Sequence, residues 1–531
     1  MNKTLAALVL GLVAGMPAHA RAPTTPAHES EGSANPKSVQ SIAAQAAYQV
    51  RDRSGTDLVL APPKLPDLSG YTAAAVMKKL VTHPAASVSV QRMQGEPALA
   101  EFTGGDERMM DWARRQQTNP RAIFIENGYL RPRDLARLLP RDQFAELEPG
   151  VYLAFLPIVV KHGATLHIDR ETKDFRLSED HGSFLVNDGK LFITDSRLTG
   201  WRESTQGPAS FRAGDRFRPF VISWGGTETY ISGSVVASLG YAKSKSYGVS
   251  ISQYSPSTDR RMKRAAPTGW IINSDFSDLW YGFYCYEADD LVLRGNTYRD
   301  NIVYGIDPHD RSKRLIIAEN IAHGTKKKHG IIVSREVNDS WIFRNKSYDN
   351  HLSGIVIDRS SINNVIAYND AHANKSNGIT IYESSDNLIW GNRITGNRRH
   401  GVLLRNSIQT LLHENEIAAN GLTGIYGATK DLTGTARNIK LDPFDPRVSM
   451  IVVGGRLLEN GTSPLKIETP QSATLYDVEL LSFDQKRGIK FSGVLSQFQE
   501  QILDILIRQK RAAVIEPVTK SHPLSAVAGG N

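Results

Sequence analysis

A glycine that recurs every 23 to 25 residues constrains the fold more than any other feature of this chain. Each occurrence follows an aromatic, polar or small residue and precedes an apolar run rich in β-forming side chains. A fixed period of this length indicates a solenoid, in which each repeat forms one coil. The glycines are Gly282, Gly305, Gly330, Gly354, Gly378, Gly401 and Gly424, at spacings of 23, 25, 24, 24, 23 and 23 residues.

Two sets of asparagines recur in phase with these glycines. The first set lies 14 or 15 residues after each glycine and comprises Asn296, Asn320, Asn345, Asn369, Asn392, Asn415 and Asn438. The second set lies five residues further on and comprises Asn301, Asn350, Asn374, Asn397 and Asn420. Asparagines stacked at one corner of successive coils satisfy backbone groups that a tight bend leaves unpaired. We therefore expect them to form ladders and not to bind ligands.

Two solenoids have periods near 23 residues, the leucine-rich repeat and the β-helix. The first needs several fixed leucines, and those positions here hold Ile, Val, Tyr, Trp and Ser without preference. The sequence therefore predicts an all-β chain, a right-handed parallel β-helix with coils of about 23–24 residues and asparagine ladders. Gly248 and Asn273 continue the series if residues 255–267 form a basic insertion that protrudes from one coil.

Composition divides the chain into five parts. Residues 1–20 contain Lys3, an apolar run and Ala18-His19-Ala20, which is typical of a signal peptide and its cleavage site. The remaining parts are a linker-like arm over 21–69, a small mixed α/β segment or N-terminal cap over 70–160 with helices near 73–81 and 132–139, the β-helix over 161–460, and a C-terminal β and helical cap over 461–531 with an amphipathic stretch at 497–508.

The same features indicate the compartment and the kind of partner. The signal peptide predicts export, and no segment approaches the roughly 20 apolar residues of a membrane helix, so we expect no membrane insertion. The single cysteine, Cys285, excludes an internal disulfide. The net charge is +8, or +7 without Lys3, and favours a polyanion. Export makes an acidic polysaccharide the expected polyanion, and nucleic acid is not expected.

Strand alternation assigns faces to the repeat. The first and third residues after each glycine are apolar and are expected to point inward, which makes Cys285 a buried filler and not a nucleophile. The fourth and fifth residues are expected to form a polar outer strip that suits an extended acidic sugar chain. The fourth position holds Tyr286, His309, Ser334, Asp358, Tyr382 and Arg405, and the fifth holds Glu287, Asp310, Arg335, Arg359, Glu383 and Asn406.

One coil departs from the repeat. After Gly305 the apolar run is replaced by Asp307-Pro308-His309-Asp310. Proline cannot donate to a strand ladder, and strand interiors normally exclude it. Sequences break such local rules most often at functional sites, so this coil is the expected reactive centre.

The segment Tyr304-Gly305-Ile306-Asp307-Pro308-His309-Asp310 resembles the signature of the periplasmic mannuronan C5-epimerases of alginate synthesis. The resemblance also covers the signal peptide, the asparagine-ladder β-helix and the chain length. It implies a periplasmic isomerase in which His309 removes the C5 proton of mannuronate, Arg335 neutralises the carboxylate, and water reprotonates the other face. It further implies contact with polymeric alginate and with other periplasmic alginate secretion proteins, and no cofactor.

The residue types agree with this chemistry. A proton alpha to a carboxylate is weakly acidic, because its removal adds a second negative charge to an anionic group. Arginine stays charged and offers two parallel donors, and Arg335 lies one coil after His309. A neutral imidazole suits the base, and Asp307 or Asp310 could orient it. The expected substrate-binding residues are Tyr286, Tyr304, Lys328, Ser334, Asp358, Arg359, Tyr382 and Arg405.

Three other interpretations compete with the epimerase. A metal site would use Asp307, His309 and Asp310 with His323 or His329, but strand alternation should turn Asp310 away from the other two. A polyuronate lyase shares the proton abstraction and differs in expelling the C4 oxygen. A non-catalytic alginate-binding scaffold would explain the outer strip but not the residues at 307–310.

Overall fold

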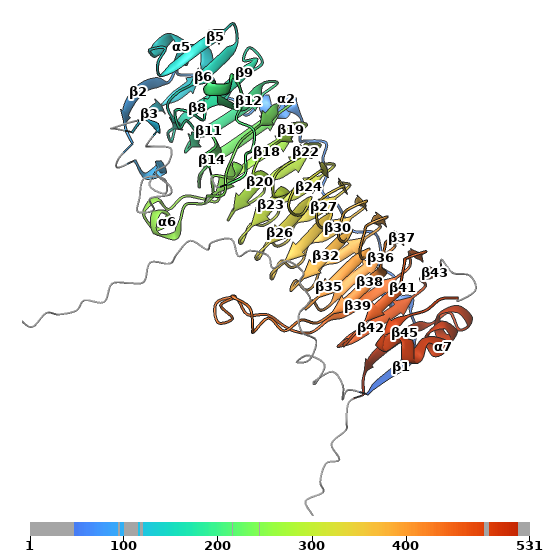
Figure 1. The fold of residues 1–531 in the computed structure, drawn as a ribbon. Coiled ribbons are helices and arrows are strands. Elements are labelled where there is room, and N and C mark those ends of the chain that lie inside the picture. Colours follow the sequence, from blue (N-terminus) through green and yellow to red (C-terminus); the bar gives the residue numbers. More distant parts are fainter. Residues whose placement is uncertain are drawn as a thin grey trace, which may run out of the picture. The chain divides into compact units, whose positions relative to one another are not determined.

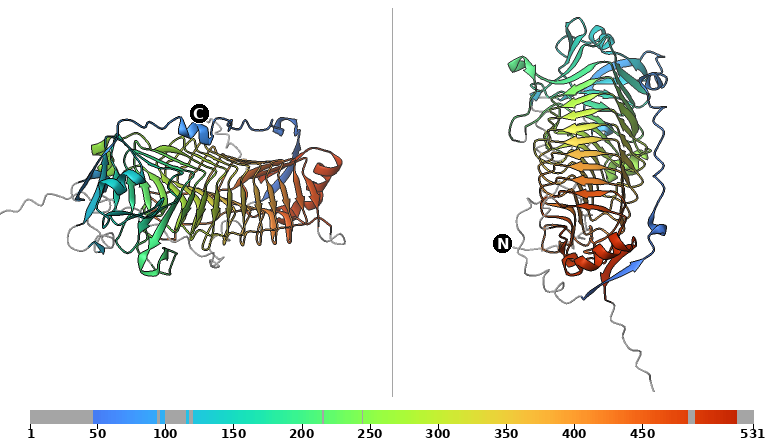
Figure 2. Two further views of the ribbon diagram at one scale, coloured as in Figure 1. Left: turned by 90° about the horizontal axis from the view of Figure 1, so that it is seen from above. Right: turned by 90° about the vertical axis from the view of Figure 1, so that its right-hand side faces the viewer.

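Three long sheets form the protein, and each coil contributes one strand to each sheet (Figure 1). The computed structural model describes residues 47–93, 96–99, 115–116, 120–214, 216–243, 245–482 and 488–518. Most neighbouring strands are parallel, as in β23 with β26 and β29 with β32. This arrangement confirms the predicted right-handed parallel β-helix, and Figure 2 shows the coils stacked along one axis.

We name the sheets A, B and C. Sheet B carries the outer strip and consists of β2 (Ser87–Arg92), β3 (Arg121–Glu126), β7 (Ile158–Val160), β10 (Leu185–Asn187), β14 (Val221–Ser223), β17 (Gly248–Ser252), β20 (Tyr281–Tyr286), β23 (Tyr304–His309), β26 (Ile331–Ser334), β29 (Ile355–Asp358), β32 (Ile379–Tyr382), β35 (Val402–Arg405), β38 (Thr423–Ala428), β41 (Ser463–Ile467) and β44 (Ser492–Gly493).

The other two sheets complete each coil. Sheet A consists of β4 (Gly128–Leu130), β8 (Ala164–Ile168), β11 (Lys190–Thr194), β15 (Glu228–Ser232), β18 (Thr268–Ile272), β21 (Val292–Arg294), β24 (Ile316–Ala318), β27 (Trp341–Phe343), β30 (Val365–Ala367), β33 (Leu388–Trp390), β36 (Thr410–His413), β39 (Ser449–Val453), β42 (Ser472–Tyr476), β45 (Ala512–Pro517) and β1 (Tyr48–Arg53). Sheet C consists of β5 (Phe144–Glu148), β6 (Val151–Ala154), β9 (Asp174–Ser178), β12 (Arg197–Arg202), β13 (Gly207–Pro208), β16 (Val235–Ala237), β19 (Asp275–Ser277), β22 (Thr297–Arg299), β25 (Ile321–His323), β28 (Lys346–Tyr348), β31 (Asp370–His372), β34 (Arg393–Thr395), β37 (Glu416–Ala418), β40 (Arg456–Leu458) and β43 (Glu479–Leu481).

The few helices lie outside the coils or at their ends. Among the described residues, the α-helices are α2 (Ala73–Met77), α5 (Pro132–Leu138), α6 (Pro256–Met262) and α7 (Gln499–Leu503), the last followed by a π-helical turn over Asp504–Arg508. The helix α6 lies in the expected insertion between β17 and β18. Within the described residues, no helix combines the length and the apolar character needed to cross a membrane.

The boundaries of the β-helix differ from those expected. The strand β3 already pairs in parallel with β7, before residue 161, and β41 to β43 continue the coils past residue 460. The expected arm over 21–69 is also not a plain linker, because β1 pairs antiparallel with β45. Residues 1–46, with the expected signal peptide, lie outside the described residues.

Both asparagine ladders form. The Nδ2 of Asn369 donates to Oδ1 of Asn392 at 2.9 Å, and the same group donates to the carbonyl of Ile342 at 2.8 Å. Each ladder asparagine also accepts a hydrogen bond from the backbone of the preceding coil, as Asn369 does from Asn345 at 2.9 Å. These bonds pair buried polar groups at every bend.

Two expected ladder members are wrong. Asn438 lies in an inserted loop between β38 and β39, where it accepts local hydrogen bonds from Lys440 and Leu441. The second ladder instead continues from Asn420 to Asn460. Asn273 is exposed, and Ser274 pairs with Asn296 in its place.

The recurring glycine and the second ladder have one structural cause. A Cβ atom at Gly354 would lie 2.7 Å from Nδ2 of Asn374 and 2.9 Å from the carbonyl oxygen of Gly378. Any side chain there would displace the ladder amide. The glycines and asparagines therefore recur together because the coil corner brings them into contact.

We expect Asn369→Ala to lower the free energy of unfolding by about 1 to 3 kcal/mol for each polar group that it leaves unpaired. The substitution removes the partner of Asn345, Ile342 and Asn392 in a fully buried corner. Denaturant unfolding should reveal the loss. The control is Asn438→Ala, which changes the same residue type outside the ladder, and an equal loss in both variants would contradict the assignment.

Candidate active site

The irregular coil after Gly305 forms β23, which ends at His309. Pro308 is buried and lies level with Cys285 of β20, so the third position remains an inward filler. Cys285 itself is a buried free thiol, and burial raises its pKa to about 12, which confirms the predicted filler role. His309 lies at the outer end of the strand with its side chain 20% exposed.

Asp310 links His309 to Arg335. Its Oδ2 accepts a hydrogen bond from Nδ1 of His309, and its Oδ1 lies 3.7 Å from Nη1 of Arg335. Burial acts to raise the pKa of Asp310, but the hydrogen bond and charge of His309 and the charges of Arg335 and Arg311 outweigh it, so this pKa lies below its ordinary value. Because an ionised carboxylate only accepts, the proton of a neutral His309 belongs on Nδ1. Nε2 then keeps its lone pair and can act as a base.

Asp310 reaches its neighbour because the chain leaves the strand in a left-handed turn. The fifth position after the repeated glycine has positive φ in six successive coils, at Glu287 (49°), Asp310 (35°), Arg335 (63°), Arg359 (50°), Glu383 (51°) and Asn406 (53°). Strand alternation therefore stops at the fourth position. The expectation that Asp310 turns away from His309 is wrong for this reason.

Asp307 forms a second polar centre beside the strand end. It is 2% exposed, and its Oδ1 accepts no hydrogen bond from the described residues. Burial raises its pKa to about 7, against the opposing charges of His309 and Lys328. Burial also lowers the pKa of Lys328, whose Nζ lies 5.7 Å from the centre of the Tyr304 ring. Near neutral pH, Asp307 can therefore either donate or accept a proton.

The tyrosines near His309 are poor bases. Tyr284 lies with its ring centre 6.0 Å from that of His309, and Tyr304 stacks on His329 at 6.0 Å. Burial raises the pKa of both phenols well above their ordinary value. Both therefore stay protonated at neutral pH, which leaves His309 as the better base.

The other expected binding residues of this coil region have internal partners. Ser334 and Asp358 are buried, and the Oγ of Ser334 donates to Oδ2 of Asp358 at 3.2 Å. The hydroxyl of Tyr286 accepts from Nη2 of Arg311 at 3.1 Å, and Nζ of Lys245 lies 4.5 Å from the centre of the same ring. The strip is thus less exposed than strand alternation alone suggests.

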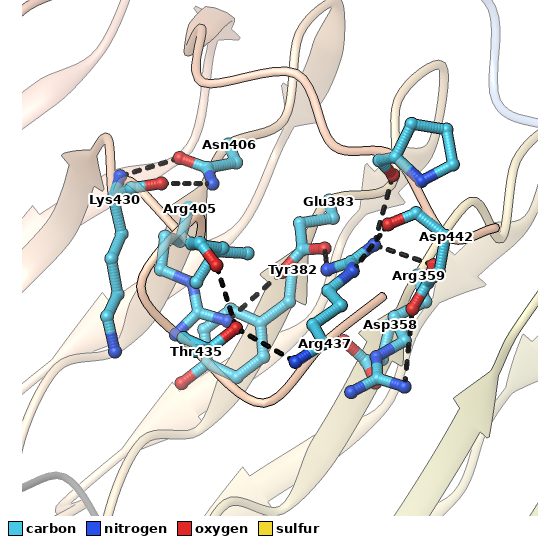
Figure 3. Close-up of polar contacts among 12 residues, drawn as sticks. Asp358, Arg359, Tyr382, Glu383, Arg405, Asn406, Lys430, Thr435, Arg437 and Asp442 are labelled. Atoms are coloured by element: carbon cyan, nitrogen blue, oxygen red, sulfur yellow. Dashed lines mark hydrogen bonds and ion pairs between the residues drawn. The ribbon is translucent and has the colours of Figure 1, made fainter. Parts of the chain in front are cut away.

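Further along sheet B, the strip lies against the loop between β38 and β39, which we call the 429–448 loop (Figure 3). Arg405 lies 3.8 Å over the ring of Tyr382, and its Nη2 lies 3.3 Å from Oε1 of Glu383. Arg437 of the loop donates to Oε2 of the same Glu383. Arg359 pairs with the loop through Asp442, at 3.7 Å.

The competing metal-site interpretation finds no support in the described residues. No group of three or more His, Cys, Asp or Glu side chains in the described residues is placed to hold a metal ion. His329 stacks on Tyr304 and accepts a hydrogen bond from the backbone of Ser353, while His323 stacks on Tyr348 of sheet C. Neither histidine is therefore directed to Asp307.

Sequence reasoning missed four residues of this region. Tyr284 occupies the second position after Gly282, which alternation also turns outward, so the repeat contained the signal. Arg311 follows the strand end, where the repeat carries no rule. Arg437 and Asp442 lie in the 429–448 loop, which was hidden because Asn438 falls in phase with the first ladder.

Comparisons with known proteins agree with the fold. The family model for right-handed β-helix regions matches residues 264–417 and 342–439. A mannuronan C5-epimerase from Pseudomonas putida is 58% identical over 473 residues, which cover 89% of this chain and 91% of that protein. The mannuronan C5-epimerase AlgG from Azotobacter vinelandii is 56% identical over 471 residues, which cover 89% of this chain and 90% of that protein.

A solved structure supports the same relationship. The crystal structure of the periplasmic alginate epimerase AlgG superposes with a TM-score of 0.78 and 55% identity, over 80% of this chain and 100% of that one. Fold and site define a right-handed β-helix protein with a histidine, a carboxylate and an arginine on one sheet face. Within that class, the chain belongs to the mannuronan C5-epimerase family.

Proposed function

We propose that this protein is a periplasmic mannuronan C5-epimerase, which converts β-D-mannuronate residues of polymeric alginate into α-L-guluronate. The observation that carries the assignment of roles is the position of Asp310 between His309 and Arg335. It holds a base and a cation next to each other on an outer face of the β-helix. An abstraction alpha to a carboxylate needs both at once.

The reaction proceeds in two proton transfers. Nε2 of His309 takes the C5 proton, and the electrons of the broken C–H bond move into the adjacent carboxylate. Arg335 meets that carboxylate with two donors as its negative charge grows. The ionised Asp310 stabilises the imidazolium that forms. Water then protonates C5 from the opposite face, and His309 releases its proton to solvent.

The remaining residues of the strip position the polymer. Arg359 and Arg405 supply charge, and Tyr286 supplies a ring surface. Tyr382 is buried beneath the guanidinium of Arg405, so we assign it a supporting role. Tyr304 is buried against His329, so we assign it a supporting role under Lys328 and Asp307. Contact with other alginate secretion proteins stays a prediction of the family resemblance.

Incubation of polymannuronate with the purified protein in deuterated water distinguishes the candidate reactions. We expect proton NMR to show guluronate residues with deuterium at C5 and no unsaturated chain ends, because abstraction and return from solvent leave the polymer intact. Unsaturated uronate ends, which absorb in the ultraviolet, would establish a lyase. Polymer binding without any isotope exchange would establish a scaffold.

A further inference from the structure

The 429–448 loop runs back along the rim of sheet B toward the active coil. It leaves β38 and meets three earlier coils in turn (Figure 3). Lys430 exchanges two hydrogen bonds of 2.7 Å with Asn406 after β35. Arg437 then pairs with Glu383 after β32, and Asp442 pairs with Arg359 after β29. The next rim residue is Arg335, so Asp442 lies against the coil next to that of Arg335 and two coils from that of His309.

The loop has a firm anchor. The side chain of Arg437 is 8% exposed and that of Glu383 is 5% exposed. Besides Glu383, Arg437 donates to the backbone carbonyl of Asp442 at 2.7 Å and to that of Pro443 at 3.0 Å. A buried arginine with several hydrogen bonds is costly to remove. We therefore expect this part of the loop to stay in place.

The contact closest to the active coil is much looser. The carboxylate of Asp442 is 35% exposed and lies 3.7 Å from Nη1 of Arg359, beyond hydrogen-bond distance. The second carboxylate beside Arg359 is that of Asp358, at 3.8 Å from Nε. An ion pair of this kind is weak because solvent screens it. A substrate carboxylate that approaches Arg359 to hydrogen-bond distance would replace it.

Arg359 is the structural counterpart of Arg335. Both occupy the fifth position of the repeat with positive φ, on successive coils about 4.8 Å apart. Both lie 3.7 Å from an internal carboxylate, Arg335 from Asp310 and Arg359 from Asp442. A polyuronate carries one carboxylate on every sugar. When one of its carboxylates lies on Arg335, a neighbouring one is within reach of Arg359.

We propose that Asp442 occupies on Arg359 the place of a substrate carboxylate, so that the 429–448 loop competes with the polymer for this subsite. The inference rests on the proposed function, because it takes a polyuronate as the ligand. Binding exchanges Asp442 for a uronate carboxylate while Arg437 keeps the loop attached. Asp442 thereby weakens polymer binding without touching the reacting sugar.

The variant Asp442→Asn tests the competition in the full-length protein. In the wild-type protein, Nη2 of Arg437 donates to Oδ1 of Asp442 at 2.7 Å. The amide oxygen of the variant can still accept this hydrogen bond, but the negative charge is removed. We expect the Kd for polymannuronate, measured by titration calorimetry, to fall roughly two- to fivefold, as for loss of one screened ion pair. KM should fall in parallel, and kcat should not change. If Asp442→Asn folds poorly, Asp442→Ser removes the same charge.

The matched control is Asp445→Asn, in the same loop. Asp445 pairs with Arg447 within the loop, so this variant changes the net charge equally without releasing Arg359. An equal gain in both variants, or no gain with Asp442→Asn, overturns the proposal. In an Arg359→Gln background, Asp442→Asn should have no effect, and a persistent gain there also overturns it.

Failure of the proposed function gives a different result. If the wild-type protein binds polymannuronate but never epimerises it, the proposed epimerase activity is disproved. The Kd values of the variants still test whether Asp442 competes with the polymer. A wild-type protein that does not bind polymannuronate disproves both.

Discussion

Replacing His309 by alanine should lower the rate of epimerisation by about 10²–10⁴-fold, the usual contribution of a positioned base. The imidazole is held at the strand end by Asp310, and the neighbouring phenols of Tyr284 and Tyr304 stay protonated because burial raises their pKa. Neither phenol can therefore replace the imidazole as the base. Guluronate formation from polymannuronate, followed by proton NMR, measures the effect.

The His309→Ala protein should remain folded. Loss of the imidazole leaves one oxygen of the buried Asp310 carboxylate without its hydrogen bond, which lowers the free energy of unfolding by about 1 to 3 kcal/mol. The control is His351→Ala, an exposed histidine that should retain full activity and stability. Substantial turnover by a folded His309→Ala protein would contradict the mechanism and make Asp307 the candidate base.

Replacing Arg335 should have an effect of similar size. We expect Arg335→Ala to lower kcat by about 10²–10³-fold, as for removal of a donor that meets developing charge. Arg335→Lys should recover little of this activity, because a single ammonium does not reproduce two parallel donors to a planar carboxylate. Initial rates on polymannuronate at saturating concentration separate this loss from a change in KM.

Two comparisons make the Arg335 result specific. Arg344→Lys alters an exposed arginine of another turn and should leave the rate unchanged. The double variant of His309 and Arg335 should be scarcely slower than either single one, because both residues serve one step. Additive losses, or full activity of Arg335→Lys, would show that Arg335 does not neutralise the reacting carboxylate.

The coil geometry was predictable from the sequence because its causes are local and repeat. Gly354 and Asn374 recur in phase since they touch at every corner, and the apolar first and third positions fill the coil interior. The irregular coil at 307–310 stands out against this regular background. Its departure from the repeat is enough to single out His309 as a candidate base.

What could not be predicted depends on contacts between distant segments. The turn of Asp310 toward His309 follows from backbone dihedral angles after the strand end, where residue type imposes no single conformation. The docking of Arg437 onto Glu383 joins positions 54 residues apart, and Asn438 imitated a ladder position by coincidence of spacing. The expected orientation of Asp310 and the expected ladder position of Asn438 were both wrong because the repeat was extended into residues that do not follow it.

The N-terminal segment after β1 follows the outside of sheet A from one end of the β-helix to the other (Figure 2). Leu65, Leu68 and Tyr71 pack in one cluster with outward residues of sheet A such as Trp341. Nη1 of Arg294 donates to the carbonyls of Leu68 and Tyr71, at 2.7 and 3.1 Å. The two ends of the described chain meet where β1 pairs with β45. There the side chain of Gln49 donates a hydrogen bond to the carboxylate of Glu516, which lies 467 positions later in the sequence.

This pairing changes how the protein unfolds and folds. A plain solenoid contacts only neighbouring repeats and can lose coils one at a time from an open end. Here β45 covers the terminal coil and β1 pairs with β45. Fraying at that end therefore also releases β1, and with it the N-terminal segment that lies along the outside of sheet A. Melting should therefore be a single cooperative transition. The same closure also means that the edge of β42 stays open to other chains until β45 and β1 have paired with it, so a chain with all its coils formed but without this pairing is prone to aggregate.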